Sequence, residues 1–372
     1  MSTWAALAMA WGGLAGGFSA VALARLMRRR PAAASTRVPV LLLRPVDAPT
    51  PRELENLATP IDYPGPLEHV VLAPERPPLP EHVRWVPSDP STPNRKVGHL
   101  LHALRVLPRE GRVVLVVDAD VVVTGELVAG LAAPVAAGSA LSTAVPTPVG
   151  ARGLSGRAVA ALLRRTHHSF RALHVMSAGA AAVCGKALGL SDRAVEELPA
   201  LADHIGEDLE LSKRLHARGL GVALCEAPAV VPLAVGDWDA ALARFTRWMQ
   251  VLRSHRPGLY PTVPLLFTPT WPLLVLGVVA GSPGLSGCVA ALVAVRSLLS
   301  WRLAGLSAPG VHAEGSSRFA LDWLLGEALL LAAFVRSLAH PPRVTWRGRV
   351  YALHPGGRMS PGWTELKQEG GV

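Results

Sequence analysis

Apolar segments at both ends of the chain constrain its fold more than any other feature. Residues Thr3 to Met27 are apolar or small, with Arg25 as the only charge. A helix of about 25 residues can cross a bilayer core of roughly 30 Å. Basic residues Arg28–Arg30 follow this run, whereas a cleaved signal peptide carries them before it. The sequence predicts a retained membrane anchor over residues 1–30, with its N-terminus outside and the following chain in the cytoplasm.

Three more apolar stretches follow Pro257, at about residues 262–281, 286–304 and 319–338. We expect two or three transmembrane helices within residues 257–340, and a basic tail over residues 341–372. Arg296 lies near the centre of the middle stretch and is costly in hydrocarbon, so this stretch is re-entrant, interfacial or packed within a bundle. The positive-inside rule favours a cytoplasmic tail, but it does not identify the stretch that fails to cross.

The charge distribution bears on the possible partners. Half of the residues are hydrophobic, and the formal net charge is +10. Basic residues gather beside the apolar segments, which is typical of a membrane protein held against an anionic leaflet. Aromatic and basic residues do not interleave, so we expect no nucleic-acid partner. The three cysteines, Cys184, Cys225 and Cys288, are too few and too scattered for a disulfide framework or a four-cysteine zinc site.

Residues 36–256 have the pattern of an α/β domain. Apolar runs predict strands at Val38–Leu43, His69–Leu72 and Val113–Val117, and runs of this kind suit a mostly parallel sheet buried on both faces. Helices are expected at Pro51–Ala58 and Lys96–Val106, whereas the proline-rich stretch Pro74–Pro93 is interpreted as a loop. The expected fold is therefore a cytoplasmic α/β domain with one N-terminal and two to three C-terminal transmembrane helices.

The strongest chemical signal is a pair of carboxylates at the end of a buried strand. Val113–Val117 leads directly into Asp118-Ala-Asp120. Ligands of open parallel sheets bind at this edge, and two carboxylates there can hold Mg²⁺ or Mn²⁺ that bridges a diphosphate. The alternative interpretation is that Asp118 caps a turn and Asp120 is solvated.

Two other motifs offer a base and a cationic clamp. Glu207-Asp208 directly precedes an amphipathic helix, where Asp208 can act as a general base or simply cap the helix. Arg244, Arg247 and Trp248 share a helix before the membrane. The arginines can clamp a diphosphate beside an apolar wall, and they also suit a basic belt attracted to anionic lipid.

Taken in order, these motifs resemble the inverting glycosyltransferases of family 2, most closely the ceramide glucosyltransferase branch and its bacterial hopanoid-associated relatives. The likeness covers most of the chain. It is carried by Arg44-Pro-Val-Asp47, Asn94-Arg-Lys96-Val-Gly-His-Leu100, Asp118-Ala-Asp120, Glu207-Asp208, Arg244-x-x-Arg247-Trp248 and Trp346-Arg-Gly-Arg349-Val-Tyr351. The segment from Arg165 to Lys186 resembles the acceptor-side region more loosely, and its histidines His167, His168 and His174 are interpreted as structural.

The resemblance implies a GT-A fold and a role for each matched residue. Asp118 and Asp120 would hold Mg²⁺ or Mn²⁺, and Asp208 would be the catalytic base. Arg247, Trp248 and Arg244 would close over the diphosphate. The donor would be bound by Arg44, Glu75, Lys96, Asp118 and Glu207. The family usually has an aspartate after its second strand, where this chain has Val71-Leu-Ala-Pro-Glu75, and the sequence leaves open whether Glu75, with its longer side chain, takes the place of that aspartate.

The implied reaction is transfer of a hexose from a UDP-sugar to the hydroxyl of a lipid such as ceramide, at the cytoplasmic face of a bacterial inner membrane. Transfer of N-acetylglucosamine to a hopanoid, a polyprenyl phosphate or a polysaccharide acceptor is the nearest alternative. A non-catalytic, lipid-binding relative is an alternative of another class. The sequence leaves open the sugar, the acceptor, the metal, the number of spans and the oligomeric state.

Overall fold

The computed structural model describes residues 3–28, 36–109, 111–176, 183–233, 236–304, 321–346 and 349–361, without the side chains of 166–176, 304 and 346. These residues form two compact units, each built from separate segments of the chain. The helical unit comprises Met1–Arg29, Pro148–Ala172 and Leu233–Pro342, and the sheet unit comprises Arg30–Thr147, Leu173–Pro232 and Arg343–Val372. The expected catalytic range 36–256 therefore contributes residues to both units.

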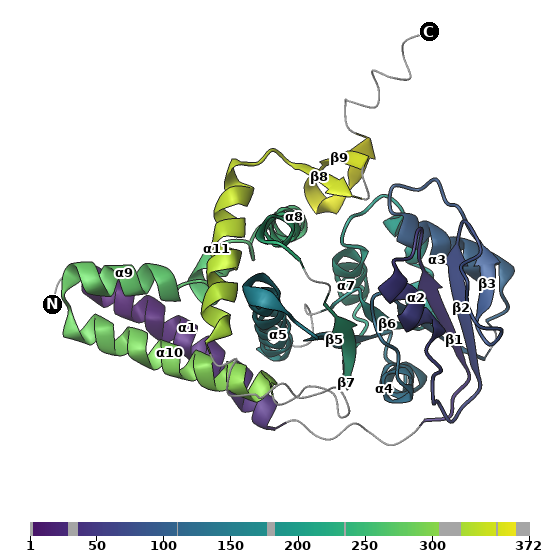
Figure 1. Cartoon of the computed structure of the whole chain (residues 1–372), viewed down its shortest axis with the longest axis horizontal. Helices are drawn as coiled ribbons and strands as arrows, with labels where there is room; N and C mark the ends of the chain where they lie inside the picture. Colours follow the sequence, from purple (N-terminus) through teal and green to yellow (C-terminus); the bar gives the residue numbers. More distant parts are fainter. Residues whose placement is uncertain are drawn as a thin grey trace, which may run out of the picture. The chain divides into compact units, whose positions relative to one another are not determined.

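A seven-stranded sheet with the order β3-β2-β1-β4-β6-β5-β7 organises the sheet unit (Figure 1). Strands β3, β2, β1 and β4 run parallel to one another, whereas β6 is antiparallel to both β4 and β5. The expected α/β class with a mostly parallel sheet is confirmed. The strands are β1 Val40–Pro45, β2 Leu67–Ala73, β3 Arg84–Pro87, β4 Val113–Val117, β5 Leu141–Val149, β6 Ala187–Leu190 and β7 Val222–Pro232.

The central strands are buried on both faces, as their apolar runs predict. In β1, Leu41 and Leu43 belong to one hydrophobic core while Leu42 belongs to the other, because side chains alternate along a strand. Helices α3 (Arg95–Val106) and α7 (Glu207–Ala217) contribute to the first core, and α4 (Gly125–Ala136) contributes to the second. The remaining helices of this unit are α2 (Pro51–Ala58), α6 (Asp192–Val195) and the short η1 (Leu198–Leu201).

Two stretches of the sheet unit are more ordered than the sequence indicates. The expected loop Pro74–Pro93 contains the strand β3, which pairs with β2. The sequence does not predict this strand because it is short and lies among prolines, whereas main-chain hydrogen bonds to β2 stabilise it. The expected tail contains a three-stranded antiparallel sheet of β8 (Arg343–Trp346), β9 (Arg349–Leu353) and β10 (Met359–Pro361). Met359 N–H donates to Asp203 O at 2.7 Å, which ties this sheet to the segment before α7.

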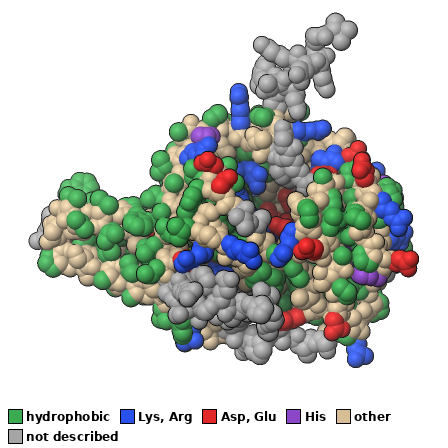
Figure 2. Space-filling view, in the orientation of Figure 1, with side chains coloured by type: hydrophobic (Ala, Val, Ile, Leu, Met, Phe, Trp, Pro, Cys, Tyr) green, Lys and Arg blue, Asp and Glu red, His purple; other side chains and the backbone are tan. Residues whose placement is uncertain are grey.

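The helical unit contains α1 (Thr3–Met27), α5 (Gly153–Met176), α8 (Trp238–His255), the π-helix η2 (Val263–Phe267), α9 (Thr270–Ala280), α10 (Pro283–Ala304) and α11 (Asp322–Ala339). Helices α1, α9 and α10 lie side by side (Figure 1). Figure 2 shows hydrophobic side chains gathered over α9 and α10. Among the described residues, Thr3–Met27 and Pro283–Leu303 are long and apolar enough to cross a membrane. Of the C-terminal stretches, therefore, only the middle one meets this criterion.

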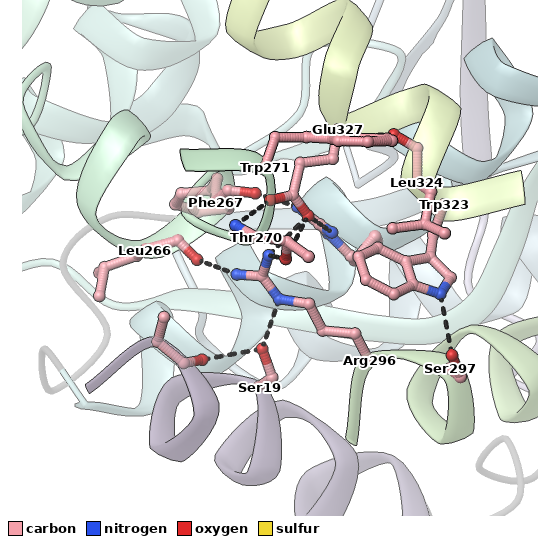
Figure 3. Close-up of polar contacts among 12 residues, drawn as sticks. Ser19, Leu266, Phe267, Thr270, Trp271, Arg296, Ser297, Trp323, Leu324 and Glu327 are labelled. Atoms are coloured by element: carbon pink, nitrogen blue, oxygen red, sulfur yellow. Dashed lines mark hydrogen bonds and ion pairs between the residues drawn. The ribbon is translucent and has the colours of Figure 1, made fainter. Parts of the chain in front are cut away.

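Buried polar contacts explain how α10 accommodates Arg296 (Figure 3). The Arg296 side chain is 1% exposed, and its guanidinium contacts Glu327 Oε2 at 2.5 Å and Thr270 Oγ1 at 2.7 Å. Glu327 on α11 also accepts from Arg165 of α5 at 2.8 Å. The ring of Trp323 lies within 5.9 Å of both guanidinium groups. Arg296 is thus packed within a helix bundle, which was one of the three expected arrangements.

Glu327→Gln is expected to destabilise the protein more than Arg296→Met. The first change leaves two buried guanidinium groups facing each other without a carboxylate, whereas the second leaves an Arg165–Glu327 pair. Breaking a buried pair in this way costs about 3–5 kcal/mol. The thermal unfolding midpoint in detergent measures the difference, and Glu55→Gln, which breaks the exposed Arg52–Glu55 pair, is the control. A Glu327→Gln protein as stable as the wild type would contradict this account.

Candidate functional site

The site begins where β4 ends. Asp118 follows the last residue of β4, and the chain then turns through Asp120. Arg44, at the end of β1, is fully buried behind this turn, and its guanidinium donates to the carbonyls of Asp118 at 2.9 Å, Ala119 at 3.2 Å and Val121 at 2.6 Å. Burial lowers the pKa of Arg44 to about 10, so the group stays charged at neutral pH. Arg44 therefore shapes the aspartate turn from behind.

The antiparallel strand β6 brings a lysine to the same place. The register pairs Val117 with Ala187, so Lys186 stands opposite Asp118, whose N–H donates to Lys186 O at 2.9 Å. The ammonium of Lys186 lies 2.5 Å from Asp120 Oδ2 and 3.7 Å from Asp118 Oδ2. A cationic side chain therefore lies beside both aspartates.

The acidic pair of α7 follows a glycine in the left-handed conformation. Gly206 has φ 70° and ψ 49°, and α7 begins with Glu207 and Asp208 in its first turn. A residue with a side chain is strained at that φ, so glycine suits this sharp entry into the helix. The helix N-terminus favours both carboxylates through its exposed N–H groups.

Asn94 and Lys96 tie α7 to the aspartate turn. The buried side chain of Asn94 caps α3 and donates to His204 O at 2.8 Å and to Glu207 Oε2 at 3.2 Å. The Lys96 ammonium contacts Asp118 Oδ1 at 2.7 Å and Glu207 Oε1 at 3.0 Å. Burial alone would lower the pKa of Lys96, but the charges of Asp118 and Glu207 outweigh it and raise this pKa.

Asp208 is held by the main chain rather than by a cation. Its Oδ2 accepts from Gly185 N–H at 2.6 Å and its Oδ1 from Leu209 N–H at 2.9 Å. A Cβ at Gly185 would lie 3.2 Å from the Asp208 carboxyl, so the absence of a side chain permits this close approach. Burial, together with the charge of Glu207, raises the pKa of Asp208 to about 6. A carboxylate with such a pKa is suited to accept a proton near neutral pH.

The pKa of the adjacent Glu207 shifts in the direction opposite to that of Asp208. Burial acts to raise the pKa of Glu207, but the charge of Lys96 outweighs it and lowers this pKa. Neighbouring carboxyl groups with opposite pKa shifts can take different roles, one as a permanent anion and the other as a base.

The other sequence-predicted residues lie in a segment after β2 and on a helix of the helical unit. Glu75 is exposed in the segment that follows β2. Arg244, Arg247 and Trp248 lie on α8 of the helical unit, where the Arg244 guanidinium stacks over the Trp248 ring at 5.6 Å. Burial and the charge of Arg244 lower the pKa of Arg247. The side chains of His167, His168 and His174 lie outside the described residues.

The chemistry of the donor set is compatible with a divalent cation. No cluster of three or more His, Cys, Asp or Glu ligands occurs within the described ranges. Mg²⁺, however, is commonly held by only one or two carboxylates together with water and substrate phosphate. Asp118 and Asp120 provide two such carboxylates, and their side chains are 29% and 36% exposed. Lys186 shares these oxygens, so a metal ion would have to displace its ammonium from Asp120.

The sequence does not predict the roles of Gly185 and Lys186. Both lie at the end of a segment that loosely resembles an acceptor region. The sequence shows only that they precede a short apolar strand. Their place beside the aspartates becomes evident once that strand, β6, is seen to pair with β4. Neither residue belongs to a motif that indicates chemistry by spacing.

Comparison with known proteins gives one family match. The family model described as glycosyl transferase family 21 matches residues 80–359, more than half of the chain. The solved structure of the mannosyltransferase PcManGT from Pyrobaculum calidifontis, in complex with GDP-Man and Mn²⁺, aligns with 17% identity and a TM-score of 0.49, over 90% of this chain and 99% of that one. S. aureus TarS 1-349 aligns with 12% identity and a TM-score of 0.33, over 87% and 99%. A search of curated proteins gave no match.

Asp208→Asn is expected to gain stability relative to the wild type as the pH rises from about 4 through 6. The folded-state pKa of about 6 lies above the ordinary value of 3.8, so the folded protein disfavours the charged carboxyl. Asp208 thus contributes full stability below about pH 4 and loses it as the pH rises through 6. The unfolding midpoint of the variant, measured with chelator present, should gain on the wild type across this pH window. A midpoint that falls relative to the wild type as the pH rises would contradict the raised pKa.

Proposed function

The chain belongs to glycosyl transferase family 21, and from that premise we propose that it is a membrane-bound, inverting enzyme of GT-A fold that transfers a hexose from a UDP-sugar to the hydroxyl of a lipid such as ceramide. Glycosyltransferase activity follows from the family. The fold family, the donor, the acceptor, the metal and the membrane setting are parts of the proposal.

The position of Asp208 is the observation that carries the proposal. The Asp208 carboxyl has a pKa near 6 and accepts a hydrogen bond from Gly185 N–H at 2.6 Å. The next residue, Lys186, contacts both Asp118 and Asp120. A base is thus joined by one short segment to carboxylates suited to a metal–diphosphate group. Inverting transfer needs both, because the acceptor must lose a proton as the diphosphate leaves.

The proposed reaction is a single displacement. Asp208 accepts the proton of the acceptor hydroxyl while that oxygen bonds to the anomeric carbon, and the bond from this carbon to the diphosphate oxygen breaks. Attack from the face opposite the diphosphate inverts the anomeric centre. A divalent cation bound by Asp118 and Asp120 would stabilise the charge of the departing diphosphate.

Other residues of the sheet unit would bind the donor or hold the site in shape. Lys96 would meet the diphosphate, with Glu207 holding its ammonium at 3.0 Å. Arg44 supports the turn that carries the two aspartates, so its part in donor binding is indirect. Exposed Glu75 is available to the nucleotide.

The family motif also assigns residues of α8 to the diphosphate. Arg247 is half-buried on α8, and its guanidinium has no hydrogen-bond or ion-pair partner within the part of the chain that the structure describes. A guanidinium with free donors suits a diphosphate, and the stacked Arg244 and Trp248 would form the wall beside it. This assignment rests on the family motif and on the local geometry of α8.

The proposed membrane setting explains the acceptor class. Helices Thr3–Met27 and Pro283–Leu303 are long and apolar enough to span, and Val278 and Val279 of α9 are largely exposed. We assign residues 1–30 as the anchor, 36–256 as the cytoplasmic catalytic region, 257–340 as membrane segments and 341–372 as a cytoplasmic tail of a bacterial inner-membrane protein. A site anchored in this way meets a lipid hydroxyl without extracting its tails from the bilayer.

Membranes containing the protein are expected to transfer labelled sugar from one of a panel of UDP-sugars into a lipid extract. Asp208→Asn should abolish labelling, because its side chain cannot accept the proton, and chelator should suppress it. Asp192→Asn, an exposed aspartate in the first turn of α6, is the matched control and should leave labelling unchanged. An active Asp208→Asn enzyme would end the base assignment. If none of the UDP-sugars gives a labelled lipid, the proposed substrates are refuted.

The rate of transfer should also report the pKa of the base. Below pH 6 the Asp208 carboxyl is protonated, so kcat/KM should fall by about tenfold for each further pH unit. Above this pKa the carboxylate is charged and the profile should level off. Initial rates between about pH 5 and pH 8 measure this limb, which the Asp192→Asn control should retain. A profile that is flat through pH 6 would argue against Asp208 as the base.

A further inference from the structure

We propose that Lys186 is an exchangeable counterion of the site: its ammonium neutralises Asp118 and Asp120 when no metal is bound, and moves to the donor diphosphate when a divalent cation takes those carboxylates. The inference rests on the proposed function, because it assigns a further residue to the same donor site. It concerns a lysine that only ends the segment with a loose likeness to an acceptor region, and to which the resemblance assigns no role.

The strand pairing fixes where Lys186 can act. Its carbonyl accepts from Asp118 N–H at 2.9 Å, so the backbone of Lys186 cannot leave without breaking the β4–β6 pairing. The side chain is a flexible four-carbon stem that ends in a point charge, and its rotation can redirect the ammonium while the backbone stays in place. The structure therefore supplies a tethered cation with freedom at its tip.

The Lys186 ammonium contacts the two carboxylates that suit a metal ion. The Lys186 ammonium lies 2.5 Å from Asp120 Oδ2 and 3.7 Å from Asp118 Oδ2, and the side chain is 16% exposed. A divalent cation on the same oxygens would lie too close to this ammonium for both charges to remain. Metal and lysine must therefore compete for Asp118 and Asp120.

The other lysine of the site does not compete in the same way. The Lys96 ammonium is held by Glu207 at 3.0 Å and by Gly185 O at 2.6 Å in addition to Asp118. Lys96 thus keeps two partners if Asp118 turns to a metal. Lys186, by contrast, has its carboxylate contacts only with Asp118 and Asp120 among the ion pairs of the described residues. Once displaced, its ammonium would be stabilised by a new anion, and a donor diphosphate bound at the same carboxylates through a metal would supply one.

The test compares metal and nucleotide binding in Lys186→Met and the wild type. Mn²⁺ titrated without nucleotide and followed by the electron paramagnetic resonance of the free ion should bind the variant about tenfold more tightly, because an opposite charge at this range shifts ionic equilibria by one unit or more. In saturating Mn²⁺, UDP measured by calorimetry should bind the variant about tenfold more weakly, because a charge-assisted phosphate contact is missing.

Two further variants separate the charge from folding. Lys186→Arg keeps the positive charge and should keep the Mn²⁺ affinity near that of the wild type. Lys213→Met removes a lysine that pairs with Glu210 at 2.6 Å on α7, and it should change neither binding constant. A thermal midpoint for each variant shows that the folded protein is compared throughout.

The outcomes distinguish this inference from the proposed function. Mn²⁺ affinity that is unchanged or weaker in Lys186→Met overturns the competition, and unchanged UDP affinity overturns the exchange. If Mn²⁺ binds without nucleotide only when Lys186 is removed, the competition is supported, and the same titration with UDP present decides the exchange: wild-type Mn²⁺ binding that appears with UDP supports it, and none overturns it. If neither protein binds Mn²⁺, the metal site and this inference both fail, while the Asp208→Asn transfer test still decides the base.

Discussion

The antiparallel pairing of β6 with β4 is the constraint on which the candidate site depends. This pairing sets Lys186 opposite Asp118, and the hydrogen bond from Asp118 N–H to Lys186 O fixes the level at which the two segments meet. Gly185 then faces the start of α7, where its N–H holds Asp208. A shift of β6 by one residue in this register would turn the Lys186 side chain to the other face of the sheet.

The charges of the site divide two neighbouring carboxyl groups into different states. Lys96 contacts Glu207 and lowers its pKa against the effect of burial, whereas Asp208 receives only main-chain donors and its pKa rises to about 6. A group that releases and binds a proton near neutral pH is the better suited of the two to serve as a base there. Lys96 thus helps to separate the pKa values of the two neighbouring carboxyl groups.

The helical unit follows a different physical rule. Its outward side chains on α9 are apolar, while Arg165, Arg296 and Glu327 are buried among its helices. A buried ion pair adds little stability by itself, but each charged member restricts how the helices can pack, because any other arrangement leaves it without a partner. Glu327 therefore joins α11 to α10 and α5 and accounts for a charge inside an otherwise apolar sequence.

The sequence by itself determined the elements whose signals are local. The predicted bounds of Thr3–Met27 and Val113–Val117 match the helix and the strand at both ends. Asp118, Asp120 and Asp208 could be selected as candidate site residues because they lie directly after a strand or at the start of a helix. Tertiary structure alone decided that β3 joins the sheet, that Arg44 lies behind the aspartate turn, and that Gly185 and Lys186 belong to the site. These features arise from contacts between residues far apart in the chain, and periodicity or spacing carries no information about such pairings.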